Sequence, residues 1–274
     1  MSIVQEMDYI LGHSQHETRR LMAQAAILRP ITERLLRSTG IGQGMRVLDV
    51  GCGAGDVTML AAELVGPYGW VVGIDRDPEV IVVAKQRAQT ATIRQIEFKA
   101  SWTDVFSDPE PFDLVVGRCV LIHQADPVGF IRAVTRLVRP GGVIAFHEIT
   151  LCEPLRTLPC VPLWKSVAEL LVSAFRTLPH HDASDRLIQH FMNAGLPLPH
   201  LFCEIPVGGG ADSLFYAWIT DTLYSLTPKL VQMGIAVSDQ VGPLETLEGR
   251  LRDATVEACS QIRGPVQVCA WTRT

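Results

Sequence analysis

A glycine-rich turn and two aspartates are the residues of this sequence whose types and spacing could do chemistry. The stretch RVLDVGCGAGDVTML, residues 46–60, is a short apolar run, then three glycines at alternating positions, then a helical pattern. Asp49 precedes the first glycine, and Asp75 follows the last by twenty residues, at the end of a second apolar run. Glycines let a backbone approach a ligand closely, and carboxylates accept strong hydrogen bonds from charged and hydroxyl donors. We therefore expect this turn to bind a ligand.

The turn does not match the G-x-G-x-x-G fingerprint of dinucleotide-binding proteins. The third glycine of that fingerprint would fall on Asp56, and a carboxylate at a helix N-terminus competes with pyrophosphate for the same place. The pattern favours a ligand with an amino-acid end, a ribose and no phosphate. Asp49 can accept from an ammonium group, and Asp75 can accept from two ribose hydroxyls. S-adenosylmethionine has these parts.

Four segments in chain order resemble the motifs of class I S-adenosylmethionine-dependent methyltransferases of the small-molecule type. They are VLDVGCGAGDVT, VVGID, FDLVVGRCVLIH and LVRPGGVIAFHE, within about residues 44–150. The opening YILGHSQHETRRLMAQ resembles the N-terminal helix of one bacterial subgroup of that family. The resemblance implies a Rossmann-like methyltransferase fold and S-adenosylmethionine as the cofactor.

The resemblance also implies which residues contact the cofactor. The glycine turn and Asp49 hold the amino-acid end, Asp75 holds the ribose, and residues 118 and 119 lie near the sulfonium. After the third strand the family usually has an acidic residue that binds the adenine amino group. This chain has Ser101 and Trp102 there, which could hydrogen-bond to adenine and stack on it. The expected cofactor contacts are Asp49, Gly51, Cys52, Gly53, Gly55, Asp75, Arg76, Ser101, Trp102, Arg118 and Cys119.

Alternating strand and helix patterns predict the sheet that positions these residues. Short β-rich runs occur at RVLDVG, GWVVGID, QIEFKA, FDLVVGR and GGVIAFHE, with helical patterns between them. Two later strands, LFCEIPV and PVQVCAWTR, complete an α/β fold with a doubly wound, mostly parallel, seven-stranded sheet. Near the N-terminus, a helix is expected to end at Pro30, which opens a second helix that stops at Gly40.

Three segments are expected along the chain. Residues 1–40 form N-terminal helices that cover the cofactor cleft, and residues 41–150 form the S-adenosylmethionine-binding core. Residues 151–274 complete the sheet. Their inserted helices, at about 153–180 and 211–263, are expected to form a lid over the carboxyl edge of the sheet, where open α/β sheets bind ligands.

Candidate catalytic residues follow the fourth and fifth strands. His123 either contacts the substrate or is a helix-start histidine bonded to the backbone. Glu148 either has a polar role toward the substrate or forms a salt bridge or cap. Strand alternation sends His147 and Glu148 to opposite sides of the sheet, so at most one points into the cleft. Tyr9, Trp164 and Trp218 are the expected substrate contacts, with packing as the alternative for each.

Composition narrows the function classes. The chain has 274 residues and a formal net charge of −5, which disfavours a nucleic-acid partner. No membrane association is expected, because no uncharged apolar run is long enough to cross a bilayer. The opening residues lack the pattern of a signal peptide, and the seven cysteines form no C-x-x-C pair, so a cytoplasmic location is expected. No metal site is expected, because no element places a further ligand beside His180 and His181.

The leading hypothesis is transfer of a methyl group to an O, N or C atom of a small molecule. A mean hydropathy of +0.21 favours an apolar or aromatic acceptor. Methylation of RNA or protein is an alternative, which the acidic charge and the lack of a D/N-P-P-[YF] tetrapeptide disfavour. A nicotinamide-dependent reductase is disfavoured because no Tyr-x-x-x-Lys dyad exists. A non-catalytic S-adenosylmethionine-binding protein stays open, as does the oligomeric state, for which a homodimer is one option.

Overall fold

The computed structural model describes residues 15–151, 153 and 155–274, which cluster into two compact units. The first, which we call the sheet unit, comprises Arg29–Glu148, Ala183–Cys203 and Val268–Thr274. The second, which we call the helical unit, comprises Ile149–Asp182, Glu204–Gln267 and, of the described N-terminal residues, 15–28. Each unit is built from segments that are distant in the sequence.

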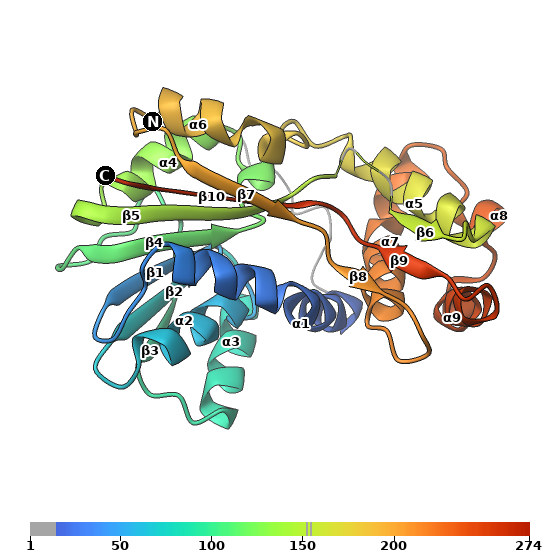
Figure 1. The fold of residues 1–274 in the computed structure, drawn as a ribbon, viewed down its shortest axis with the longest axis horizontal. Helices are drawn as coiled ribbons and strands as arrows, with labels where there is room; N and C mark the ends of the chain where they lie inside the picture. The colour runs from blue at the N-terminus through green and yellow to red at the C-terminus, as the bar shows by residue number, and fades with distance from the viewer. Residues whose placement is uncertain (1–14, 152, 154) are drawn as a thin grey trace. The chain divides into compact units, whose positions relative to one another are not determined.

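The sheet unit is built on a seven-stranded sheet with the order β3-β2-β1-β4-β5-β10-β7 (Figure 1). The first five strands in this order pair in parallel. Strand β10 runs antiparallel to β5, because Thr150 donates to the carbonyl of Val266 at one end and Thr274 donates to the carbonyl of Gly142 at the other. The predicted mostly parallel seven-stranded sheet is confirmed. The strands are β1 (Arg46–Val50), β2 (Trp70–Asp75), β3 (Ile96–Ala100), β4 (Phe112–Arg118), β5 (Val138–Ile149), β7 (His200–Glu204) and β10 (Gln267–Arg273).

The parallel register brings the carboxyl ends of β1, β2 and β4 to one edge of the sheet. Asp49 lies opposite Gly73 of β2 and opposite Val116 of β4. Asp75 and Arg118 therefore each lie two residues further along their strands than the positions that face Asp49. The apolar side chains of β1, β2 and β4 are buried on both faces of the sheet, as expected of a parallel sheet that is covered on both sides.

Helices cover the two faces of the sheet. Figure 1 shows α4 (Pro127–Thr135) and α6 (Leu187–Asn193) on one side, and α2 (Asp56–Val65) and α3 (Pro78–Thr90) on the other. The ring of Phe146 in β5 marks the first side, because its centroid lies 6.3 Å from that of Phe130 in α4 and 5.9 Å from that of Phe191 in α6. The 3-10 helix η1 (Leu121–His123) joins β4 to α4, and η2 (Ala183–Arg186) precedes α6.

The N-terminal region differs from the prediction of two helices. Helix α1 (Gln15–Ser38) is continuous and contains Pro30. A proline inside a helix removes one backbone hydrogen bond. Here Leu28, Ile31 and Leu35 are buried on one stripe that continues across it. Burial of this stripe outweighs the missing bond, so the helix does not end.

The helical unit contains four α-helices and one short 3-10 helix among the described residues after 148. They are α5 (Pro162–Phe175), α7 (Phe215–Gln232), α8 (Val237–Val241), η3 (Leu244–Thr246) and α9 (Leu247–Glu257). The indole of Trp164 in α5 donates to Thr255 in α9 at 2.7 Å, and its ring centroid lies 6.1 Å from that of Tyr216 in α7. Three short antiparallel strands that the sequence did not indicate complete the unit: β6 (Arg156–Leu158), β9 (Gln261–Arg263) and β8 (Val207–Gly208).

Within the described residues, no helix has the length and apolar character needed to span a bilayer.

Candidate active site

The turn after β1 has a backbone that only glycine tolerates well. Gly51, Gly53 and Gly55 all have positive φ angles, of 68°, 51° and 85°. A Cβ atom on Gly51 would lie 2.5 Å from a methyl carbon of Val120, and one on Gly55 would lie 2.7 Å from the ring of Phe98. The three predicted glycines therefore form a tight loop in a backbone conformation that other residues would strain.

Asp75, at the end of β2, is bonded to this turn. Its Oδ2 accepts the backbone N–H of Gly53 at 2.9 Å, and its Oδ1 accepts the N–H of Asp77 at 3.0 Å. Burial raises the pKa of the Asp75 carboxyl, and the two backbone hydrogen bonds oppose that shift. The carboxylate thus joins the second strand to the loop that follows the first.

Asp49 is a buried carboxyl beneath the same turn. Its Oδ2 accepts the hydroxyl of Thr58 at 2.6 Å. Among the described residues, no donor reaches its other oxygen, Oδ1, although that atom is buried. Burial raises the pKa of Asp49 to about 7, against the lowering effects of the Thr58 hydrogen bond and the Arg118 charge. A buried carboxylate oxygen without a donor fits a ligand that carries an ammonium group.

Asp56, the first residue of α2, is held by two arginines. Arg87 of α3 contacts one carboxylate oxygen at 2.6 Å, and Arg118 lies 4.0 Å from the other. Arg87 also donates to the carbonyl of Ala54 in the turn at 2.6 Å. The charge of Asp56 is therefore compensated within the protein, and the turn is tied to α3.

Arg118 continues this network toward β5. Its guanidinium donates to the hydroxyl of Thr32 in α1 at 3.4 Å, and that hydroxyl is 3.0 Å from Nδ1 of His147. The side chain of His147 has no exposed surface, and that of Arg118 is 10% exposed. His147 is thus a buried partner of Thr32, on the face opposite the one that Phe146 occupies.

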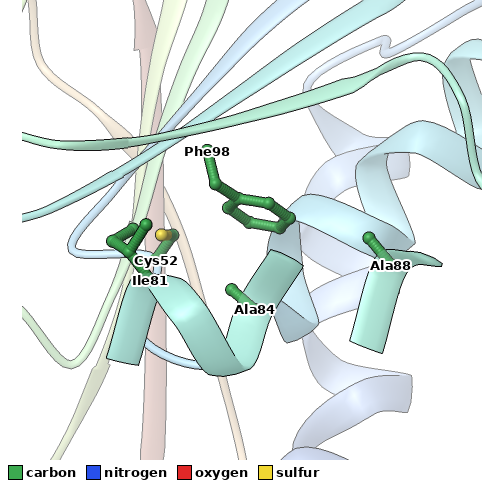
Figure 2. Close-up of a cluster of buried hydrophobic side chains, with 5 residues drawn as sticks. All are labelled: Cys52, Ile81, Ala84, Ala88 and Phe98. Carbon is green, nitrogen blue, oxygen red and sulfur yellow. The ribbon is translucent and has the colours of Figure 1, made fainter. Parts of the chain in front are cut away.

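The side chain of Cys52 packs into the protein below the turn. Figure 2 shows it in a cluster with Ile81, Ala84, Ala88 and Phe98, all of them buried. Burial raises the pKa of the thiol well above its ordinary value. The thiol is therefore engaged in packing, and the backbone is what this residue can offer to a ligand.

Glu148 holds the loop that follows β4. Its Oε1 accepts the backbone N–H groups of Val120 and Leu121, both at 3.0 Å, and its side chain has no exposed surface. Burial raises the pKa of Glu148 to about 7, while the backbone hydrogen bonds oppose the shift. These two hydrogen bonds cap the 3-10 helix η1. A cap was one of the roles that the sequence left open for Glu148. His123 ends η1 and is half-buried.

The loop that Glu148 holds begins with a strained residue. Cys119 has a φ angle of +55°, and its N–H donates to the carbonyl of His147 at 2.8 Å. A non-glycine residue in the left-handed region persists only where its surroundings fix it. The contacts of Glu148 and His147 supply that support.

Trp102 and Arg76 lie together beyond the ends of β3 and β2. The guanidinium carbon of Arg76 is 5.4 Å from the centroid of the Trp102 ring, and Trp102 is 43% exposed. The backbone of Ser101 donates to the carbonyl of Asp75 at 2.8 Å. An exposed indole beside a guanidinium, next to Asp75, fits a flat aromatic group.

The predicted substrate residues are not part of this group in the sheet unit. Trp164 and Trp218 belong to the helical unit, where they are 1% and 3% exposed and form part of its core. Tyr9 lies outside the described residues. In the part of the chain that the structure describes, no group of three His, Cys, Asp or Glu side chains could hold a metal ion.

Thr32, Thr58 and Arg87 support the site and were not predicted from the sequence. Arg87 and Asp56 are 31 residues apart, and Thr32 and His147 are 115 apart. No spacing rule links such positions. Thr58 carried a weak signal, because it is a polar residue on the apolar face of the predicted helix after the turn.

Comparison with known proteins decides the family. A family model described as Methyltransferase domain matches residues 41–193, more than half of the chain. The chain belongs to this methyltransferase family. The resemblance to class I S-adenosylmethionine-dependent methyltransferases is thereby confirmed, and membership implies S-adenosylmethionine as the cofactor.

Similar proteins support the same family. The chain is 33% identical over 164 residues to the ubiquinone biosynthesis O-methyltransferase of Cereibacter sphaeroides, covering 56% of this chain and 61% of that protein. It is 36% identical over 118 residues to the aklanonic acid methyltransferase DauC of a Streptomyces species, covering 43% and 54%. The chain thus spans little more than half the length of these curated relatives. A crystal structure from Bacillus halodurans C-125, described as a methyltransferase, has a TM-score of 0.58 over 88% of this chain and 97% of that one, at 19% identity, and shows the shared fold.

Proposed function

We propose that this protein transfers a methyl group from S-adenosylmethionine to an oxygen atom of a small, apolar or aromatic metabolite. The observation that carries the proposal is the buried Asp49 carboxyl with one oxygen free of donors, beneath a glycine turn that Asp75 clamps. The names of the two similar proteins, an O-methyltransferase of quinone biosynthesis and a methyltransferase acting on aklanonic acid, support a small-molecule acceptor.

In this proposal each part of the cofactor has a partner. Asp49 binds the ammonium group, and the nearby guanidinium of Arg118 favours the carboxylate of the same amino-acid end. The backbone of Gly51, Gly53 and Gly55 lies along this amino-acid end of the cofactor. Asp75 binds the ribose hydroxyls, and the exposed Trp102 stacks on the adenine beside Arg76. Cys119 lies near the sulfonium.

Methyl transfer forms an oxygen–carbon bond while the carbon–sulfur bond breaks, and the acceptor proton leaves to solvent or to a nearby base. Orientation of two bound reactants can supply about 7–11 kcal/mol, so the residues named above act mainly by placing the methyl carbon in line. We assign Glu148 and His147 positioning roles, because both are fully buried and hold other groups. His123, half-buried after β4, is the residue proposed to contact the acceptor.

Two measurements test the proposal. Calorimetric titration should show binding of S-adenosylmethionine and S-adenosylhomocysteine, and no binding of NADH. Incubation with phenol, enol, amine and carbon-acid acceptors should release S-adenosylhomocysteine with the phenols or enols. Binding without turnover on any acceptor would favour a non-catalytic binding protein, and absence of binding would overturn the proposal.

Further proposals concern the location of the protein and its binding partners. We propose a cytoplasmic location, which the seven cysteines without a C-x-x-C pair support, and no nucleic-acid partner, which the net charge of −5 supports. Within the helical unit, we propose that Trp164 and Trp218 stabilise the packing of its helices, because both side chains are buried. Cell fractionation and activity on RNA substrates test the first two.

A further inference from the structure

Strand β7 forms one edge of the seven-stranded sheet. In the described part of the chain the sheet order ends with β10 and then β7, so one side of β7 has no neighbouring strand. Its sequence is HLFCE. Natural edge strands are usually protected from pairing with other chains by lysines, prolines or bulges. This strand has none of these residues and carries three apolar side chains in a row.

Exposed apolar side chains occur on β7, in the loop that leads to it, and on α6. Ile188 and Met192 lie four apart on one face of α6 and are 48% and 49% exposed. Leu198, in the loop that leads to β7, is 64% exposed, and Leu201 of β7 is 40% exposed. Leu198 and Leu201 thus present apolar surface at an open strand edge, which is typical of an interaction surface.

The side chains of β7 alternate between the two faces of the sheet. Phe202 lies under Arg34 of α1, whose guanidinium carbon is 4.6 Å from the ring centroid, and His200 stacks on Trp271 at 5.1 Å. His200, Phe202 and Glu204 therefore lie on the α1 face. Leu201 and Cys203 lie on the other face, the one that α4 and α6 cover.

We propose that two copies of this chain pair through β7, antiparallel and about a two-fold axis perpendicular to the sheet. Such an axis keeps each side chain on its own face, so opposing positions must differ by an even number of residues. The register that pairs the whole strand places Phe202 opposite the partner subunit's Phe202. It places His200 opposite the partner subunit's Glu204, and Leu201 opposite the partner subunit's Cys203.

This register is complementary in charge and in polarity. The imidazole of His200 faces the carboxylate of the partner subunit's Glu204, and the two-fold axis produces this pair twice. Leu201 and Phe202 each face an apolar or aromatic side chain, which are favourable cross-strand pairs. The same symmetry brings the exposed apolar residues of α6 from both copies to the same side of the joined sheet. A second copy of this chain is therefore the partner that the edge fits. The inference does not depend on the proposed enzymatic activity.

A single cysteine tests the register. The variant Leu201→Cys would place a thiol opposite the partner subunit's native Cys203, so mild oxidation should yield a covalent dimer on non-reducing gels. The matched control Leu201→Cys with Cys203→Ser should yield none, because it lacks the partner thiol. It keeps Cys160 and Cys259, the other exposed cysteines of the described residues, so any cross-link through them would appear in the control as well. Absence of cross-linking in the first variant, or cross-linking that persists in the control, would overturn the register.

Analytical ultracentrifugation tests the dimer itself. The unmodified protein should sediment with the mass of two chains, and Leu201→Lys should sediment as one. His200→Glu should weaken the dimer by about tenfold or more, because it places like charges opposite each other twice. The double variant His200→Glu with Glu204→Lys should restore the affinity. Circular dichroism confirms that each variant is folded. A single-chain mass for the unmodified protein, or a dimer unaffected by Leu201→Lys, would contradict the proposal.

Discussion

Asp75 accepts the backbone N–H of Gly53 at 2.9 Å, so the end of the second strand fixes the loop that follows the first. The same carboxylate is placed to bind the ribose in the proposed function. Loss of this one side chain would therefore remove a direct contact and loosen the turn.

Substitution of Asp75 by alanine should weaken S-adenosylmethionine binding at least tenfold. Hydrogen bonds to a charged group contribute roughly 1.5–3 kcal/mol each, and two are lost. Calorimetric titration with S-adenosylhomocysteine measures the effect without turnover. Asp77→Asn is the matched control, because the Asp77 side chain caps α3 by accepting from the backbone of Glu79, and an asparagine oxygen can accept the same hydrogen bond. Unchanged affinity in Asp75→Ala would refute the ribose assignment.

Cofactor affinity should rise with pH between 6 and 8. The pKa of Asp49 is about 7 in the fold, so the carboxyl is largely neutral below that pH and ionised above it. An ammonium group needs the ionised form, and affinity should therefore increase about tenfold from pH 6 to pH 8. Titrations in buffers of different ionisation enthalpy should show proton release below pH 7. The Asp49→Asn variant should bind S-adenosylmethionine weakly. Its affinity should change little between pH 6 and 8, although Glu148, whose pKa is also about 7, still titrates in this range. A pH dependence that survives in this variant would exclude Asp49 as its source.

The same substitution should stabilise the cofactor-free protein. The folded pKa of Asp49 lies above the ordinary value of 3.8, so the folded state holds a proton that the unfolded state releases between about pH 4 and 7. Stability falls as pH rises through that window and stays lower above it. Asp49→Asn removes this loss, by an amount on the order of 2–4 kcal/mol at pH 8 and much less at pH 4.5. Urea unfolding at both pH values measures the difference. Equal effects at the two pH values would contradict the burial explanation.

The sequence predicted the parts of the fold that depend on local patterns. The strands of the sheet, the three glycines of the turn and the aspartate after the second strand all follow from periodicity and spacing along one short segment. Asp56 was recognised as incompatible with bound pyrophosphate, and the structure gives its partners, Arg87 and Arg118. Those partners come from different elements, and no local pattern identifies them.

The features that local patterns left open or mispredicted have physical causes. Pro30 indicated a helix end, but buried leucine and isoleucine side chains on both sides keep the helix intact. The three short strands of the helical unit have only two or three residues each, too few to show an alternation. Trp164 and Trp218 could have been core or lid residues from their spacing alone. The contacts that bury Trp164 come from Tyr216 of α7 and Thr255 of α9, which lie far along the chain.

Glu148 provides a last test, because a capping role and a catalytic role predict different results for the Glu148→Gln variant. Its Oε1 accepts two backbone N–H groups, and a glutamine can offer a carbonyl oxygen in the same place. Glu148→Gln should therefore retain most of its methyl-transfer rate. Glu148→Ala leaves two buried N–H groups without an acceptor, which should cost about 2–4 kcal/mol of stability and lower the melting temperature by several degrees. Thermal melts and turnover rates of the two variants, measured side by side, distinguish the roles. If Glu148 instead removed a proton from the acceptor, the glutamine variant would fold normally and lose activity as completely as the alanine variant does.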